Sequence, residues 1–107
     1  MIQNTVTKIH GDGEHRAPIY FNLGQVLITR GIEALERRLP CDFLGICLSR
    51  HQHGDWGRVC QEDKAANDEA LREGFRILSV YVFSDIRIWI VTEADRSVTT
   101  ILLPSEY

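Results

Sequence analysis

The sequence lacks the features that would assign it to several common functional classes. No apolar stretch approaches the roughly 20 residues that a membrane-spanning helix needs. The first residues, Met1 to Thr5, show neither the basic start nor the apolar core of a signal peptide, so we expect a cytoplasmic protein. No glycine-rich loop follows a predicted strand, and we therefore expect no nucleotide cofactor.

Cysteine and basic residues are also scarce. Cys41, Cys47 and Cys60 are an odd number of thiols without a Cys-x-x-Cys pair, so we expect free cysteines and no disulfide framework. A zinc site formed by Cys47, Cys60, His51 and His53 is the less favoured alternative. The formal net charge of −3 gives no overall attraction to nucleic acid, which makes nucleic acid a less favoured partner than protein.

The 107 residues, 44% of them hydrophobic, suffice for one modest core. Residues 1–17 show little periodicity and are expected to form a flexible N-terminal arm, whereas residues 18–107 are expected to form a single domain. Residues 18–29 are β-prone but interrupted by Gly24, which predicts a short strand or a bulged pair of strands.

Two helices are predicted next. Apolar residues recur at helical spacing over residues 30–38, and Thr29 is suited to cap the first turn. Pro40 separates this helix from a second one, which ends at Gly54 and Gly57. The inner face of the second helix is predicted to carry Cys41, Leu44, Leu48 and His51.

A third helix is predicted over residues 62–73, with Asp63 as a possible N-cap and Gly74 as the C-cap. Its apolar stripe is thin, consisting of Ala66, Ala70 and Leu71, so we expect it to be mostly exposed to solvent.

Three β-rich segments, residues 75–83, 86–93 and 98–103, predict an antiparallel meander. A two-residue loop at Ser84-Asp85 would pair Phe83 with Ile86 and would place Arg76 opposite Glu93 as a cross-strand ion pair. The expected fold class is α+β, with two to three helices packed on this meander and residues 18–29 as a candidate additional strand.

Both faces of the meander are apolar at mid-strand. We call the second one the Trp89 face; its residues are Arg76, Leu78, Val80, Val82, Arg87, Trp89, Val91 and Glu93. Because a sheet with one wet face alternates more cleanly, we expect the Trp89 face to be covered by a helix, by the N-terminal segment or by another molecule. A homodimer or a partner protein on this face is therefore a hypothesis.

Polar and aromatic side chains are concentrated in residues 50–57, Arg-His-Gln-His-Gly-Asp-Trp-Gly. His51 continues the inward stripe of the second helix and is either a core histidine or a functional one. Asp55 and Trp56 follow the helix end and are expected at an exposed corner, where they could contact a partner.

The chain resembles a small family of bacterial proteins carried on plasmids and integrative elements. The resemblance covers about Phe21 to Tyr107, and its motifs are Leu-Gly-Gln-Val at residues 23–26, Arg-His-x-x-Gly-Asp-Trp-Gly at 50–57 and Ile-Trp-Ile-Val-Thr-Glu-Ala-Asp-Arg-Ser at 88–97. Members are often labelled type I restriction methylation subunits, but this chain has neither a glycine-rich cofactor loop nor an Asn-Pro-Pro-aromatic motif. The resemblance implies an accessory role on a mobile genetic element.

Two functional classes remain. The first is a protein-binding accessory protein or inhibitor of host defence, of the anti-CRISPR or anti-restriction type, because small acidic domains with apolar faces act by occupying a partner's surface. Its partner-binding residues are predicted to be Asp55, Trp56, Trp89, Arg96 and Tyr107, with Tyr81 as a further anchor. The alternative for Trp89 and Tyr81 is that they belong to the core of a two-sided sheet.

The second class is a metal-independent endoribonuclease or toxin, since helices followed by a meander resemble the barnase, colicin and RelE-like group in outline. Such chemistry needs a base, an acid and a cation. The catalytic candidates are His51, Asp55, Arg76, Ser79 and Glu93, with Arg96, Thr99 and Tyr107 in supporting roles. Alternatively, these residues are structural: Asp55 caps a loop, Arg76 and Glu93 form a cross-strand ion pair, and Arg96 bonds its neighbours in a turn. Between the two classes, the negative net charge favours protein binding.

Overall fold

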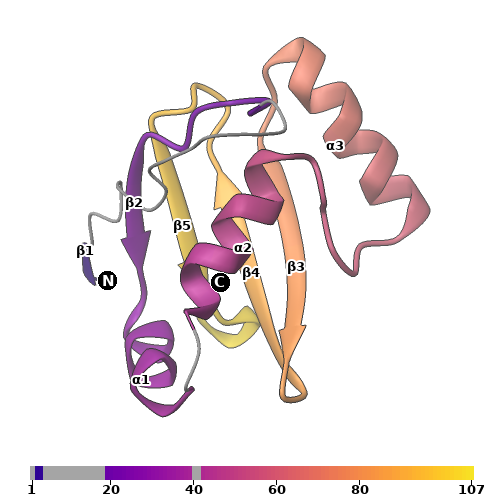
Figure 1. Cartoon of the computed structure of the whole chain (residues 1–107). Coiled ribbons are helices and arrows are strands. Elements are labelled where there is room, and N and C mark those ends of the chain that lie inside the picture. The colour runs from indigo at the N-terminus through magenta and orange to yellow at the C-terminus, as the bar shows by residue number, and fades with distance from the viewer. Residues whose placement is uncertain (1, 4–18, 40–41) are drawn as a thin grey trace.

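The computed structural model describes residues 2–3, 19–39 and 42–107. The chain has an α+β fold in which three helices accompany one mixed sheet of strand order β1-β2-β5-β4-β3 (Figure 1). The elements are β1 Ile2–Gln3, β2 Gln25–Ile28, α1 Arg30–Arg38, α2 Phe43–Gln52, α3 Gln61–Glu73, β3 Ile77–Phe83, β4 Ile86–Thr92, β5 Val98–Leu102 and the 3-10 helix η1 Pro104–Glu106. None of the helices in these ranges is long and apolar enough to cross a membrane.

The sheet combines the predicted meander with strands from the N-terminal part of the chain. β3, β4 and β5 are antiparallel, whereas β2 runs parallel to β5, and β1 pairs antiparallel with β2. The predicted strand at residues 18–29 is thus real but shorter, because only Gln25–Ile28, after Gly24, pair with β5. Apart from β1, the predicted arm lies outside the described residues, as do Pro40 and Cys41.

The bounds of α1 agree with the prediction, and the Thr29 Oγ1 accepts a hydrogen bond from the Ile32 N–H at 3.4 Å. In α2 the cap is Asp42, whose Oδ1 accepts from the Gly45 N–H at 3.1 Å. The predicted inward stripe of α2 is confirmed for its described members, Leu44, Leu48 and His51, which are all buried.

The N-cap predicted for α3 is wrong. Cys60 is the cap, since its Sγ accepts from the Asp63 N–H at 3.4 Å, while Asp63 lies in the first turn. Ala66 is exposed and Asn67 takes its place on the buried side beside Ala70. The C-cap prediction is confirmed, because Gly74 adopts the left-handed conformation with φ of 79°.

The predicted register of the meander is confirmed. Phe83 pairs with Ile86, and the two loop residues Ser84 and Asp85 have φ angles of 50° and 66°. Positive φ at both central positions is the signature of the type I′ turn, which matches the twist of a hairpin. The predicted ion pair also forms, with 3.5 Å between the Arg76 Nε and the Glu93 Oε1.

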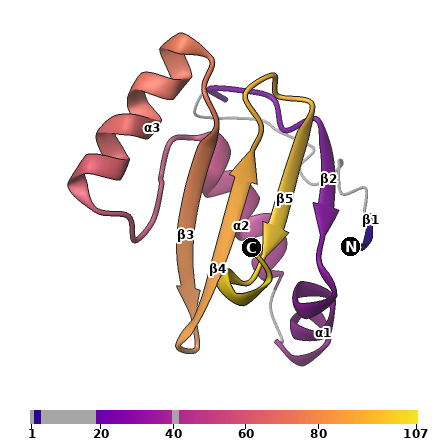
Figure 2. The same ribbon diagram turned by 180° about the vertical axis from the view of Figure 1, so that it is seen from behind.

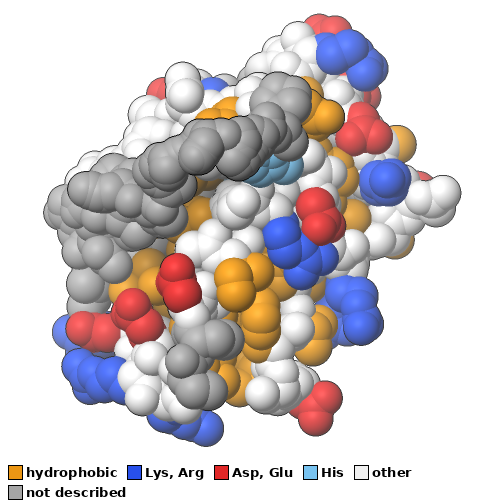
Figure 3. All heavy atoms as spheres, in the orientation of Figure 1, with side chains coloured by type: hydrophobic (Ala, Val, Ile, Leu, Met, Phe, Trp, Pro, Cys, Tyr) orange, Lys and Arg blue, Asp and Glu red, His pale blue; other side chains and the backbone are white. Residues whose placement is uncertain are grey.

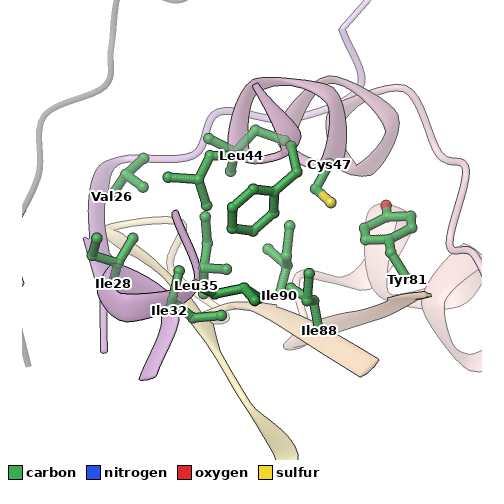
Figure 4. Packing of buried hydrophobic residues seen from close by; sticks show 12 residues of the cluster. Val26, Ile28, Ile32, Leu35, Leu44, Cys47, Tyr81, Ile88 and Ile90 are labelled. Carbon is green, nitrogen blue, oxygen red and sulfur yellow. The ribbon is translucent and has the colours of Figure 1, made fainter. Parts of the chain in front are cut away.

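The two faces of the sheet differ in what covers them. α2 crosses one face, and side chains of β2, α1, α2 and the meander fill the core between them (Figure 4). Seen from behind, the Trp89 face carries, of the helices in the described ranges, only η1, which packs on β4 (Figure 2). Among the described residues, the cover of the Trp89 face is therefore the turn at 104–107, not a long helix.

Candidate functional site

The run at residues 50–57 forms a corner whose polar groups bond to one another. The Arg50 guanidinium donates to both carboxylate oxygens of Asp55, from Nε at 2.7 Å and from Nη2 at 3.2 Å. Asp55 Oδ1 also accepts from the Gly57 N–H at 3.2 Å, and these bonds hold the pKa of the Asp55 carboxyl below its ordinary value. Arg50 lies 4.5 Å above the Tyr81 ring, whose hydroxyl donates to the Asp55 carbonyl at 2.6 Å.

Trp56 is buried, and the expectation that it lies at an exposed corner is wrong. Its side chain is 4% exposed and packs with Phe21, Ala70 and Ile77. Its Nε1 donates to the Asp68 carboxylate at 3.0 Å. In this conformation the indole is core and is not available to a partner.

The reason is a tertiary contact that turns the chain inward after Asp55. Gly57 forms a parallel bridge with Val80 on the outer edge of β3. The Val80 N–H donates to the Trp56 carbonyl at 3.1 Å, and the Arg58 N–H donates to the Val80 carbonyl at 2.6 Å. A Cβ at position 57 would stand 1.9 Å from the Val80 oxygen, so only glycine permits this approach.

His51 is the centre of a buried hydrogen-bond network. Its Nδ1 lies 2.5 Å from the Ser79 Oγ and its Nε2 lies 2.9 Å from the Thr92 Oγ1. Thr92 in turn contacts the Thr99 Oγ1 at 2.7 Å, and the Thr99 hydroxyl donates to the Leu23 carbonyl at 2.7 Å. Every side chain of this network is nine-tenths or more buried.

The Leu23 carbonyl at the end of the network determines which group donates in each bond back to the His51 Nε2. A carbonyl only accepts, so the Thr99 proton is used there and Thr92 must donate to Thr99. Thr92 then accepts from the His51 Nε2–H, and because the lowered pKa keeps the ring neutral, the Nδ1 lone pair accepts from Ser79. His51 is thus a neutral Nε2–H tautomer with both nitrogens satisfied.

Electrostatics agree with this assignment. Burial, and to a smaller extent the nearby Arg96 charge, together lower the pKa of His51 from 6.5 to about 3. A histidine that is 0% exposed and bonded at both nitrogens does not reach a substrate in this conformation. The core interpretation of His51 therefore accounts for its position.

A second polar group lies on the Trp89 face. The Arg76 guanidinium bridges two side chains: Nε lies 3.5 Å from the Glu93 carboxylate and Nη1 donates to the Tyr107 hydroxyl at 2.9 Å. These contacts, the Tyr107 bond first, raise the pKa of Arg76. The Tyr107 ring meets the Trp89 ring edge-on, with 5.4 Å between centroids.

Glu106 positions Tyr107 on this face. Its carboxylate accepts from the Thr29 hydroxyl at 2.5 Å and from the backbone N–H groups of Leu103 and Gly31, each at 2.9 Å. Burial raises the pKa of Glu106, but these three hydrogen bonds outweigh it and the net pKa is lowered. The carboxylate thus anchors η1 at the first turn of α1.

Arg96 bonds to the backbone around it. Its Nη1 donates to the carbonyls of Phe75, Glu93 and Ala94 at 2.7, 3.1 and 3.1 Å, and its Nη2 donates to the Ala70 carbonyl at 2.9 Å. The alternative interpretation, a turn residue that bonds its neighbours, is confirmed. Its guanidinium also ties the β4–β5 turn to the end of α3.

The catalytic candidates do not converge on one open site. They divide into the buried pair His51 and Ser79, the corner carboxylate Asp55, and the exposed pair Arg76 and Glu93. Within the described ranges no three His, Cys, Asp or Glu side chains are grouped to hold a metal ion. Of the predicted partner-binding residues, only Trp89 and Tyr107 contact each other through their rings.

Sequence reasoning missed three residues that shape these groups: Asn67, Thr92 and Glu106. Thr92 is a polar residue at a predicted inward position, and Asn67 is a polar residue next to one. A polar side chain at or beside the predicted core was the signal that could have identified both. Neither a protein-family model, nor a curated protein, nor a solved structure matches this chain. Function is therefore inferred from the geometry of the described residues and from the sequence motifs.

Proposed function

We propose that this chain is a protein-binding module whose contact surface is the Trp89 face, centred on Trp89 and Tyr107. The observation that carries the proposal is the edge-on pair of these two rings on a face that, within the described part of the chain, η1 alone covers, with Tyr107 68% exposed. Aromatic side chains supply most of the binding energy in many protein interfaces, because they bury a large area at a low cost in conformational entropy.

The surroundings of the two rings fit this role. Leu78 and Val82 are half-buried on the same face, and the side chains of Arg76 and Glu93 are 51% and 44% exposed beside them. An apolar centre with charged groups at its margin is the usual anatomy of a protein interface. The opposite side, which carries α2, shows charges of both signs interspersed with small apolar areas (Figure 3).

The nature of the partner is suggested by the sequence motifs. Their resemblance to small proteins of plasmids and integrative elements favours a host protein as the partner, and a component of a host defence system as its class. An inhibitor of this kind works by occupying a surface and needs no catalytic group, which is consistent with a His51 that is enclosed in the core.

The test is capture of a host protein by the immobilised chain, followed by reconstitution of the complex from purified components. We expect Trp89→Ala and Tyr107→Ala each to weaken the reconstituted complex at least about tenfold, as loss of an aromatic anchor does. Ile46→Ala is the matched control, because Ile46 is 45% exposed on α2. Equal binding by all variants would exclude the Trp89 face as the contact surface.

RNA cleavage is a second candidate function, and one observation favours it. Glu93, Arg76 and Tyr107 supply a carboxylate, a guanidinium and a phenol on an exposed face. Arg76 contacts both of the others, and the three are the groups that removal of a 2′-hydroxyl proton, stabilisation of the phosphorane and protonation of the leaving oxygen require. In this version of the hypothesis Glu93, not His51, is the base.

Growth inhibition and cleavage of total RNA by the purified chain test this second function. Glu93→Gln should abolish both effects if Glu93 is the base, while Trp89→Ala should leave cleavage of a short RNA largely intact. Absence of cleavage by the wild-type chain, or equal cleavage by Glu93→Gln, would eliminate it.

A further inference from the structure

We propose that the Trp89 face also joins two copies of this chain, with β4 of one copy packed antiparallel over β4 of the other. This inference rests on the proposed role of the Trp89 face in protein binding and names one of its occupants as a second copy. It follows from the order of charges along β4, which is complementary to itself.

The outward-facing positions of β4 and the residue after it are Arg87, Trp89, Val91 and Glu93. A positive charge thus lies at one end of the row and a negative charge at the other, with the half-buried Trp89 and the buried Val91 between them. Arg87 is exposed, and the Glu93 side chain is 44% exposed. Arg87 is open to a molecule on this face, and the Glu93 carboxylate, which lies 3.5 Å from the Arg76 Nε of its own copy, would be shared with an incoming guanidinium.

Only one direction of stacking satisfies these charges. When two identical faces meet about a twofold axis that is perpendicular to β4, position 87 of each copy lies over position 93 of the other. Arg87 then faces Glu93 twice, as an isologous interface requires. A parallel stack would instead place Arg87 over Arg87 and Glu93 over Glu93, which is repulsive.

The edge of the sheet is a poorer site for self-association. β3 is the outer strand of the meander, but the backbone groups of Val80 already bond to Trp56 and Arg58, and those of Leu78 bond to the Asn67 side chain. At these two positions the edge has no N–H or C=O group left to template another strand. Contact between two faces is therefore favoured over pairing between two edges.

The face is small, so the dimer is expected to be weak. Three strands of seven, seven and five residues, together with η1 and Tyr107, form a surface at the lower end of specific interfaces. We expect a dissociation constant of about 1–100 µM, a range typical of small and transient contacts.

Two variants of the full chain, each with one charge of the row reversed, test the proposal. Arg87→Glu leaves two acidic groups on the row, and Glu93→Arg leaves two basic groups. By sedimentation equilibrium, each variant alone should dimerise at least about tenfold more weakly than the wild type, while an equimolar mixture should form a heterodimer about as tight as the wild-type dimer. Circular dichroism of each variant checks that the fold is retained.

Two results would overturn the proposal: a wild-type chain that stays monomeric at several hundred micromolar, or variants that dimerise alone as well as the wild type does. Neither result would affect the proposed recognition of a host protein, which is measured by reconstitution with Trp89→Ala. Conversely, if the chain binds no host protein but the charge-exchange variants dimerise as expected, the second copy remains the occupant of this face.

Discussion

Asn67 completes the edge of the sheet at Leu78. The Asn67 side-chain amide donates from Nδ2 to the Leu78 carbonyl at 2.8 Å, and its Oδ1 accepts from the Leu78 N–H at 3.2 Å. One side chain thus makes the two hydrogen bonds that a neighbouring strand would make. Because Asn67 is on α3, these bonds also attach that largely exposed helix to β3.

Asn67→Ala should destabilise the fold by about 1–3 kcal/mol, since it leaves two backbone groups of Leu78 without partners. Glu69→Ala, at an exposed position of the same helix, should change stability by less than about 0.5 kcal/mol. Urea denaturation of both variants gives the comparison. If the two variants are equally stable, the contact with Leu78 does not hold α3 in place.

Gly57→Ala and Gly74→Ala form a matched pair, because the φ angles are 74° and 79°. The left-handed backbone alone costs an alanine about 1–2 kcal/mol, and at Gly74 nothing else opposes the added methyl group. At Gly57 the methyl group also meets the Val80 carbonyl and breaks the bridge to β3. Chemical denaturation should therefore show a loss at position 57 that is larger by at least about 1 kcal/mol.

Stability should fall as the pH drops below the ordinary pKa of histidine. The pKa of His51 is about 3 in the folded state, against 6.5 for an ordinary histidine, so the unfolded chain binds more protons between these limits. The contribution of His51 is complete above pH 6.5 and is lost on the way down to pH 3. From pH 7.5 to pH 5.0 the loss amounts to about 2 kcal/mol.

Urea denaturation at several pH values above 5 measures this loss while most carboxylates remain ionised. His51→Gln, whose carboxamide does not titrate, should remove most of the slope. If that variant does not fold, nitrogen NMR of the wild type still decides, because the ring should remain a neutral Nε2–H tautomer at pH 5. A protonated His51 at pH 5 in the folded chain would contradict the network.

Thr92→Val isolates the hydroxyl at the middle of the network, since valine has nearly the same shape. The change leaves the His51 Nε2–H without its acceptor and should cost about 1–3 kcal/mol. Thr100→Val is the control, because Thr100 lies half-buried on the other side of the sheet, outside the network. A similar change in thermal stability for the two variants would mean that the hydroxyl of Thr92 contributes little.

Local signals were sufficient for most of the fold. Thr29 begins α1 with a side-chain hydrogen bond and Gly74 ends α3 in the left-handed conformation, and both contacts involve only residues nearby in the sequence. The loop at 84–85 sets the whole register of the hairpin. That register also placed Ser79 and Thr92 on the inward face. Two inward hydroxyl-bearing residues opposite an inward histidine were therefore a readable sign of a buried polar network.

The roles of the residues after α2 were not predictable in this way. Trp56 was expected outside because it follows a helix end between two glycines, yet its direction depends on the bridge between Gly57 and Val80, which are distant in the sequence. Arg96 likewise gains two of its partners, the Phe75 and Ala70 carbonyls, only when the end of α3 and the β4–β5 turn come together. Such contacts depend on how the elements pack, and sequence periodicity carries no information about that.

The network around His51 has a consequence for the uniqueness of the fold. Its five groups, on Leu23, His51, Ser79, Thr92 and Thr99, come from the segment before β2, from α2 and from each strand of the meander. A slip of one residue in any strand would turn its hydroxyl to the opposite face and leave a buried polar group unsatisfied. An entirely apolar core would tolerate several such arrangements, whereas this one penalises every arrangement except the native one.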